Sequence, residues 1–434
     1  MSDANLSEAS FIRAFMDRST LHNSQLDGAN LTGASLVGAN LIDASICNAD
    51  LSGADLSESR CSGANFFGSR LVKSILVFAN MTWTNLSGSD LSGSVIAGSH
   101  FSHSNLSYAD LSDVDMEGAE MHEARLVNAK LNRINASGIN MEKADLTRAD
   151  LSDAILEDAK MDETKLVGAR LNGADVTESS MKDADLRGAD LTGTRLVGTN
   201  LVSSNMKGLK MPRTNAMSAK MSWADLSDSR LSSSQLSRVE FFGTNLSNAD
   251  LSDADLTRAY MMSANLTGAD LRRADLSYSD LTNARLKGAN LNSAKLDYTA
   301  LNGADLTGAD LVLARLQGLN LVDANFYRSK LEGATLQGPM LIQNVNLSKC
   351  NLTNSRLELI MLKNVSLAWT DLRNADLSMI MMMNVDFDGA NLEHIKYDEF
   401  TLQNLLNSRL NKTSMSEDLK KDLDRLRGQT IGQS

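Results

Sequence analysis

Proline and aromatic residues are scarce in this chain of 434 residues. Proline occurs only twice, and Phe, Trp and Tyr together make up 5% of the sequence. A packed α/β enzyme of this length usually contains more aromatic and β-branched residues. The hydrophobic content is nevertheless 42%, which argues against extended disorder. Most of the apolar residues are Leu, Ala and Met, so we expect a regular architecture built from small and unbranched side chains.

Cysteine, basic charge and long apolar runs are also in short supply. Cys47, Cys61 and Cys350 are odd in number, widely spaced and without a metal-binding spacing, which favours a reducing compartment. The first ten residues have neither a basic start nor an apolar core, and no apolar run reaches eighteen residues. The formal net charge of −12 disfavours direct nucleic-acid binding. We therefore expect a cytoplasmic protein without a transmembrane segment.

Recognisable catalytic motifs are missing as well. The sequence contains no convincing nucleophile–base–acid spacing and no phosphate-binding glycine loop. His100, His103 and His122 fall near one another in the repeat described below, and a metal site could be built from them. Surface ladders of hydrogen-bonded side chains are far commoner at such positions. We therefore predict no enzyme activity, no cofactor and no metal site.

A five-residue repeat dominates what is present. A large apolar residue, here called the centre, recurs every fifth position from Leu21 to Leu341 and again from Leu347 to Leu402. The residue two before each centre is usually Ala, Ser or Thr, and the residue one before is commonly Asp or Asn. The register changes by one residue between Leu341 and Leu347, next to Pro339.

A period of five fits neither a helix nor a simple strand. A stripe with this spacing wanders around an α-helix of 3.6 residues per turn, and along a β-strand alternate centres would face opposite sides. A coil that turns a corner every five residues resolves both problems, because four sides of twenty residues close a square. The centre and the small residue two before it then point inward at every repeat.

This pattern resembles the pentapeptide repeat family, whose motif is written A(D/N)LXX. Residues 49–53 (ADLSG) and 304–308 (ADLTG) are typical copies, and the resemblance covers about nine tenths of the chain. It implies an all-β solenoid, a right-handed quadrilateral β-helix. At a strand spacing of about 4.8 Å, about nineteen coils are expected.

The two ends are predicted to be covered by helices. Residues 1–18 fit the repeat loosely, but Phe11, Ile12, Phe15 and Met16 also form a helical stripe, and we favour a short capping helix there. The repeat domain is then 19–403, followed by a tail, 404–434, with an amphipathic helix at 415–427. The apolar face of this helix forms either a lid on its own last coil or a homodimer contact. It consists of Leu419, Leu423 and Leu426.

Apolar residues at outward positions indicate candidate partner surfaces. One group surrounds a single coil, and a second lies on one face further along. A third group lies near the C-terminus and consists of Leu359, Met361, Met379, Met381, Met383 and Trp369. For this third group we favour cover by the C-terminal helix over a partner surface. The first two groups are Phe67, Val72, Ile75, Val77, Phe78 and Trp83, and Trp223, Phe242 and Met262.

Outward charge is uneven around the square. Two adjacent faces hold most of the net negative charge, although outward residues twenty apart, such as His103, Glu123, Lys143 and Glu163, alternate in sign. The densest acidic stretch consists of Asp115, Glu117, Glu120, Glu123, Glu157, Asp158, Asp162, Glu163, Asp175 and Glu178.

The sequence favours a non-catalytic binding or scaffold protein with a protein partner of unknown identity. The family resemblance implies two alternatives. Some members are acidic DNA mimics that bind and protect gyrase or topoisomerase, which fits the acidic faces. Others are secreted bacterial effectors, although no separate N-terminal domain supports that alternative here.

Overall fold

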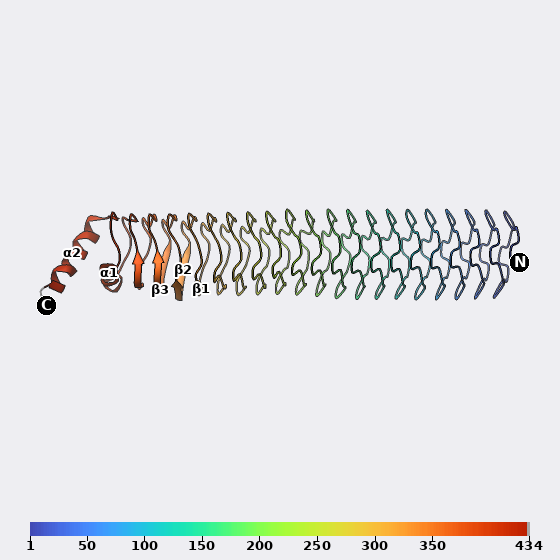
Figure 1. The fold of residues 1–434 in the computed structure, drawn as a ribbon, viewed down its shortest axis with the longest axis horizontal. Coiled ribbons are helices and arrows are strands. Elements are labelled where there is room, and N and C mark those ends of the chain that lie inside the picture. Colours follow the sequence, from blue (N-terminus) through green and yellow to red (C-terminus); the bar gives the residue numbers. More distant parts are fainter. Residues whose placement is uncertain (432–434) are drawn as a thin grey trace. The chain divides into compact units, whose positions relative to one another are not determined.

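The computed structural model describes residues 1–431 and divides into two compact units, Met1–Ala224 and Asp225–Ser434. Within each unit the chain forms stacked coils of similar size (Figure 1). The coils contain mostly single β-bridges separated by turns, and extended strands occur only in the second unit among the described residues.

The pentapeptide around Leu186 shows how each side of a coil is built. Ala184 and Leu186 are buried, whereas Asp185 between them faces outward. The Ala189 amide donates to the Leu186 carbonyl at 3.0 Å and closes a β-turn. Gly188 occupies the third turn position with φ of +66°, a conformation that glycine adopts without steric cost. The predicted inward pair therefore matches the structure at this repeat.

Neighbouring coils pair through their backbones at an interval of twenty residues. Gln25 pairs in parallel with Ser45, and the Leu26 amide donates to the Ser45 carbonyl at 2.7 Å. The Gln25 amide donates to the preceding coil, at the Ala4 carbonyl, so each bridging residue connects coils on both sides. Four corners in twenty residues make the chain a β-solenoid, as predicted.

The predicted helix at residues 1–18 is wrong. Asn5, Ser10 and Phe15 already form parallel bridges to the residues twenty positions later. The Leu6 amide donates to the Gln25 carbonyl at 2.7 Å, so the coil satisfies backbone groups through pairing that an isolated helix would not provide. The apparent helical stripe is split between two directions: Met16 is buried, whereas Phe15 is 92% exposed.

A parallel four-stranded sheet distinguishes the second unit. Its strands are β1 (Asn320–Val322), β2 (Thr335–Gln343), β3 (Arg356–Ser366) and β4 (Met381–Asp386), in the order β1-β2-β3-β4. The pairing of β2 with β3 shifts between Gln337 and Met340. This irregularity contains Gly338, with φ of +103°, and the exposed Pro339.

The change of register lies earlier than the sequence predicted. Leu336 is buried as a centre, but the next buried centre is Ile342, because Leu341 points outward and is 38% exposed. The extra residue therefore lies between Leu336 and Ile342, not between Leu341 and Leu347. A bulge can absorb one residue there because glycine tolerates positive φ and proline needs no ladder hydrogen bond.

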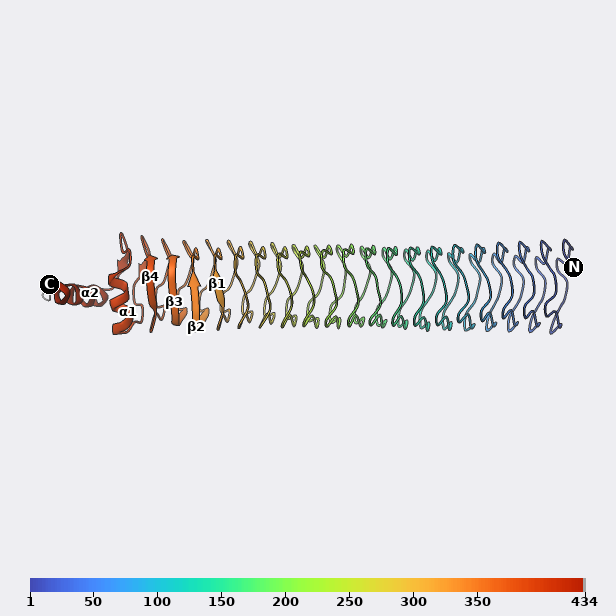
Figure 2. The ribbon, with the colours of Figure 1, turned by 60° about the horizontal axis from the view of Figure 1, so that its bottom comes forward.

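The last coil is closed by helices instead of continuing to residue 403. The remaining elements are β5 (Asn391–Leu392), α1 (Glu399–Leu406), β6 (Ser414–Met415) and α2 (Glu417–Ile431). Figure 2 shows the two helices at the C-terminal end of the second unit. Asp398 caps α1 by accepting a hydrogen bond from the Thr401 amide at 2.7 Å, and Leu402 and Leu405 are buried. The predicted helix at 415–427 corresponds to α2, and β6 pairs with β5 beside it.

Candidate interaction surfaces

The apolar girdle of the first unit lies on the outside of the coils. Phe67, Ile75, Phe78 and Trp83 are exposed, and Val72 and Val77 are half-buried. We define these six residues as the girdle. All are directed outward, while the neighbouring centres Phe66, Leu71, Leu76 and Met81 are fully buried. These exposed apolar side chains therefore mark a candidate interaction surface.

Two girdle residues occupy positions where large side chains are unfavourable. Phe78 and Trp83 are the third residues of their turns, with φ of +56° and +61°. A non-glycine residue in this left-handed region costs roughly 1–2 kcal/mol of conformational energy. Both side chains also lie over the next coil: Phe78 covers Gly98, and the Trp83 ring stacks on His103 at 4.1 Å between centroids. The rings are thus held at the surface.

Two residues of the histidine cluster, His103 and His122, lie close to one carboxylate. Glu123 lies 3.2 Å from His103 Nδ1 and 3.4 Å from His122 Nε2, and the two imidazole rings meet edge to face at 5.9 Å. His100 is a separate bridge partner of Glu120 on the next coil. Within residues 1–431 no group of three or more metal-ligating side chains has a geometry that could hold a metal ion.

Several acidic side chains of the predicted stretch have polar partners along the stack. Glu123 contacts His103 and His122, Asp175 lies 3.6 Å from Arg195, and Glu120 accepts a hydrogen bond from Asn140. Asp162 accepts from the Lys182 amide at 2.9 Å. Three exposed acidic side chains of the predicted stretch lie close in sequence, at Glu157, Asp158 and Glu163, whereas Asp115, Asp162 and Asp175 are half-buried. Glu117, Glu123 and Glu178 are exposed on other coils.

Ion pairs between outward side chains make the free energy of unfolding depend on pH. The Arg187 guanidinium donates to both Asp185 oxygens, at 2.8 and 2.6 Å, and holds the pKa of this carboxyl below its ordinary value, against the opposing effect of burial. Arg373 acts in the same way on the pKa of Asp371. Because the pKa of each carboxyl is lower in the folded state, the ionised carboxylate stabilises the folded state above the unfolded-state pKa of about 3.9. This stabilisation is lost as the pH falls through the folded-state pKa.

We therefore expect the urea midpoint of unfolding to be flat between pH 5 and 7 and to fall steeply below about pH 4. Asp185→Asn should retain its neutral hydrogen bonds and show a smaller fall between pH 5 and 3 than the wild type. A midpoint that stays constant down to pH 3 would contradict this expectation.

The predicted group of Trp223, Phe242 and Met262 spans both units. Trp223 belongs to the first unit and is exposed, whereas Phe242 and Met262 belong to the second. Phe242 is exposed and Met262 is half-buried. Each residue has the outward direction that its place in the repeat implies. Their combination into one partner surface stays a prediction.

The C-terminal helix does not cover the third apolar group, contrary to the expectation we favoured. This group consists of Leu359, Met361, Met379, Met381, Met383 and Trp369. Leu419, Leu423 and Leu426 of α2 are buried at the end of the last coil. The Tyr397 hydroxyl donates to Asp422 at 2.9 Å, and Arg425 lies 3.3 Å from Glu399 at the start of α1. The apolar face of α2 is thus used inside its own chain, as the lid interpretation requires.

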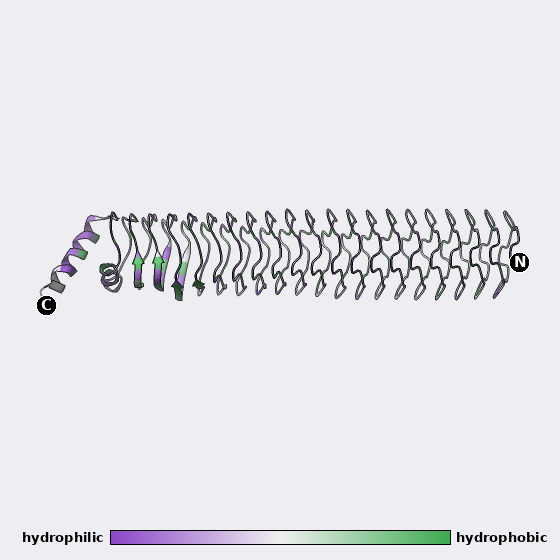
Figure 3. Ribbon diagram, viewed as in Figure 1, coloured by the Kyte–Doolittle hydropathy of each residue, from purple (hydrophilic) through white to green (hydrophobic). Residues whose placement is uncertain are grey.

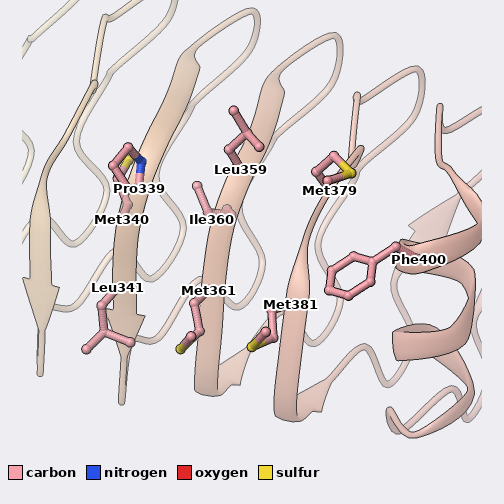
Figure 4. Close-up of a pocket in the computed structure, with 9 residues that line it drawn as sticks. All are labelled: Pro339, Met340, Leu341, Leu359, Ile360, Met361, Met379, Met381 and Phe400. Atoms are coloured by element: carbon pink, nitrogen blue, oxygen red, sulfur yellow. The ribbon is translucent and has the colours of Figure 1, made fainter.

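An open groove remains over the sheet instead. It has a volume of about 540 Å³, and Figure 3 shows hydrophobic segments on β3 and β4, which form part of it. In Figure 4, Pro339, Leu359 and Met379 form one row, Leu341, Met361 and Met381 form a second, and Phe400 of α1 closes one end. Four of these residues, Leu359, Met361, Met379 and Met381, were predicted from the sequence to be outward apolar residues. Pro339, Leu341 and Phe400 were not, because the repeat pattern assigned Leu341 to the interior and extended the coils to residue 403.

Comparison with known proteins agrees with this architecture. A family model described as pentapeptide repeats matches residues 1–162, 169–338 and 342–378 in overlapping segments. The chain therefore belongs to the pentapeptide repeat family. No curated protein sequence matches it. None of the helices described in residues 1–431 is long and apolar enough to cross a membrane.

Several solved structures are similar to parts of this chain. HetL from the cyanobacterium Nostoc sp. strain PCC 7120, involved in heterocyst differentiation regulation, is 31% identical over 47% of this chain and 91% of its own, with a TM-score of 0.32. QnrB1, a plasmid-mediated fluoroquinolone resistance protein, is 16% identical over 54% and 95%, with a TM-score of 0.26. Rfr23 from the cyanobacterium Cyanothece 51142 is 25% identical over 30% and 90%, with a TM-score of 0.21.

Proposed function

We propose that this chain is a non-catalytic scaffold that binds a protein partner through the girdle of its first unit. The observation that carries this proposal is the exposure of Phe78 and Trp83, 66% and 65%, at turn positions with positive φ. Asn, Asp or Gly would be more favourable there for folding alone. Exposed aromatic residues are the side chains that most often anchor protein interfaces.

A reducing, cytoplasmic environment is part of this proposal. Cys47, Cys61 and Cys350 are all free thiols. Burial raises the pKa of the Cys61 and Cys350 thiols to about 12, so both remain protonated and act as small apolar residues of the interior. The core therefore uses cysteine for packing and needs no oxidising compartment.

The acidic DNA-mimic function is the second candidate, and a specific cluster favours it. Glu157, Asp158, Asp162 and Glu163 lie within seven residues, and three of their side chains are exposed. A surface of this sign could occupy a site that normally binds the DNA backbone. The ion pairs on neighbouring columns and the apolar girdle make it the less favoured of the two. The secreted-effector alternative has no feature of its own in the structure.

One binding experiment separates the two candidates. The tagged protein is used to recover partners from a lysate of its native cell, alongside the variant Phe67→Asn/Phe78→Asn/Trp83→Asn. We expect the variant to lose the partner by more than about tenfold, because truncating aromatic anchors typically costs over 1 kcal/mol each. Its melting temperature should stay close to the wild-type value, because asparagine tolerates the positive φ at positions 78 and 83 and Phe67 is exposed.

The control variant is Tyr108→Asn, which changes a residue that is 69% exposed at an equivalent turn position, with φ of +61°. It should bind as the wild type does. Reversal of Glu157, Asp158, Asp162 and Glu163 to Lys tests the mimic in a topoisomerase supercoiling assay. If the girdle variant binds normally while the reversed protein loses an effect on supercoiling, the scaffold proposal fails and the mimic replaces it.

A further inference from the structure

We propose that the girdle binds an arginine side chain of its protein partner at Gly63, between the Trp83 ring and the Asp43 carboxylate. This inference rests on the proposed scaffold function and names the chemistry that the girdle recognises. Asp43, Gly63 and Trp83 lie in one column, twenty residues apart, and each is the third residue of its turn with positive φ. All three residues are exposed.

The column covers one face of the Trp83 ring and leaves the other face open. On the side of the following coil the ring stacks on His103, with an angle of 12° between the two planes, and Glu123 lies 3.2 Å from His103 Nδ1. On the side of the preceding coil the column contains Gly63, which has no side chain to cover the ring. The indole is therefore held with its open face toward the gap at Gly63.

The Asp43 carboxylate reaches into the same gap from the other side. It is the group that a Cβ on Gly63 would meet, so the Asp43 side chain extends along the column toward Trp83. Among residues 1–431 the Asp43 carboxylate forms no ion pair. The backbones at Asp43 and Trp83 are two coil spacings apart, roughly 10 Å, which leaves room for one flat group between the two side chains. A carboxylate and the face of a tryptophan both attract a cation.

The chain contains both halves of the proposed contact at equivalent positions. Arg133 lies one coil after Asp113 and donates to its two carboxylate oxygens, each at 2.7 Å. Arg258 lies one coil before Tyr278, and its guanidinium carbon is 6.0 Å from the centroid of that ring. All four residues are the third residues of their turns. The column geometry therefore allows a guanidinium to pair with the preceding carboxylate and to lie over the following ring.

A partner arginine that enters at Gly63 would make both contacts at once. Its guanidinium is planar and carries parallel N–H donors, so it can stack on the Trp83 ring while it donates to the Asp43 oxygens. Lysine has a compact ammonium group that satisfies only the ionic part of this site. The net charge of −12 also attracts a basic segment of a partner.

Tyr108 is a comparison site in the same unit. It is 69% exposed at the same turn position, and Gly88 precedes it in its column, as Gly63 precedes Trp83. The position one coil further back is Gly68, which carries no carboxylate. We therefore expect an arginine to bind at Trp83 and not at Tyr108.

A fluorescence titration tests this site without the partner. In a Trp223→Phe/Trp369→Phe background Trp83 is the remaining tryptophan. The probe is the peptide acetyl-Gly-Arg-Gly-amide, compared at equal ionic strength with peptides that carry lysine or the uncharged citrulline in place of arginine. We expect the Trp83 emission to saturate with a dissociation constant on the order of millimolar for the arginine peptide. The lysine peptide should bind at least about threefold more weakly, and the citrulline peptide at least about tenfold more weakly.

Four variants of this background protein locate the contact, and unchanged melting temperatures show that they are folded. Asp43→Asn should weaken binding of the arginine peptide by at least about fivefold. Gly63→Arg should abolish binding, because the chain's own arginine then occupies the site. Asp183→Asn removes an exposed carboxylate of the same column, seven coils away from Asp43, and should bind as the background protein does. In the exchange Trp83→Tyr/Tyr108→Trp the emission should not respond to the arginine peptide.

Three results would overturn the arginine site: equal binding of the citrulline peptide, unchanged binding to Asp43→Asn, or no change in emission up to about 50 mM arginine peptide. The scaffold proposal is tested separately, by recovery of the partner with Phe67→Asn/Phe78→Asn/Trp83→Asn. If that variant keeps the partner while the arginine peptide binds at Trp83, the scaffold proposal fails and the arginine site remains.

Discussion

Replacement of Leu186 by aspartate is expected to destabilise the first unit by roughly 4 kcal/mol or more. Leu186 is fully buried, and Leu166 and Met206, its equivalents one coil before and one coil after, are fully buried as well. Removing a leucine from such a site costs about 2 to 5 kcal/mol by itself. The new carboxyl would add a penalty, because the interior around it is lined by centres and small residues with no counter-charge.

Urea unfolding followed by circular dichroism measures this effect, and Asp190→Ser is the matched control. The Asp190 side chain is not merely solvated: it accepts hydrogen bonds from the Thr192 amide at 3.1 Å and from the Thr192 hydroxyl at 2.6 Å. Serine retains an acceptor at this position, so we expect a loss below about 1 kcal/mol. Equal destabilisation by the two substitutions would contradict the inward and outward assignment.

Removal of residues 414–434 is expected to convert a soluble protein into an aggregating one. The deletion takes away β6, which pairs with β5 at Asn391 and Leu392, and it removes α2 with its three buried leucines. The last coil would then present unpaired backbone groups, and α1 would lose its neighbour. Open sheet edges of this kind readily pair with other chains.

Light scattering and the melting temperature measure the consequence. Leu423→Asp should reproduce most of the effect without shortening the chain, because Leu423 is buried at the end of the coil. Arg427→Ala, on the exposed side of α2, should behave as the wild type does. A truncated protein that remains soluble and melts at the wild-type temperature would show that α2 is not the lid. A dimer that dissociates cleanly into soluble monomers on truncation would instead favour a dimerisation helix.

The direction of most side chains could be predicted from the sequence because the repeat fixes it locally. Each pentapeptide contains its own turn, and the amide of the next small residue closes that turn onto the centre, as Ala189 does onto Leu186. Inward positions at Ala184 and outward positions at Phe78 and Trp83 follow from counting alone. The same counting placed the six girdle residues on the surface.

The errors occurred where two local patterns competed. At residues 11–16 the helical stripe and the five-residue repeat were both present, and pairing with the second coil decided between them. Near Pro339 either Leu341 or Ile342 could serve as the centre. The bulge at Gly338 decided in favour of Ile342 and turned Leu341 outward, which created one row of the groove.

The sequence by itself determined the solenoid and which side chains point inward or outward. The reason is that apolar residues spaced five apart can all be buried only if the chain turns at every repeat. The sequence also determined that a helix follows the coils. The tertiary structure decided where this helix lies, where the register shifts and which apolar surface remains open. Those outcomes depend on contacts between residues about twenty positions apart and on the pairing of the last coil, which no local pattern contains. The groove over β2 to β4 exists because α2 packs on the end of the last coil instead of on the face of the sheet.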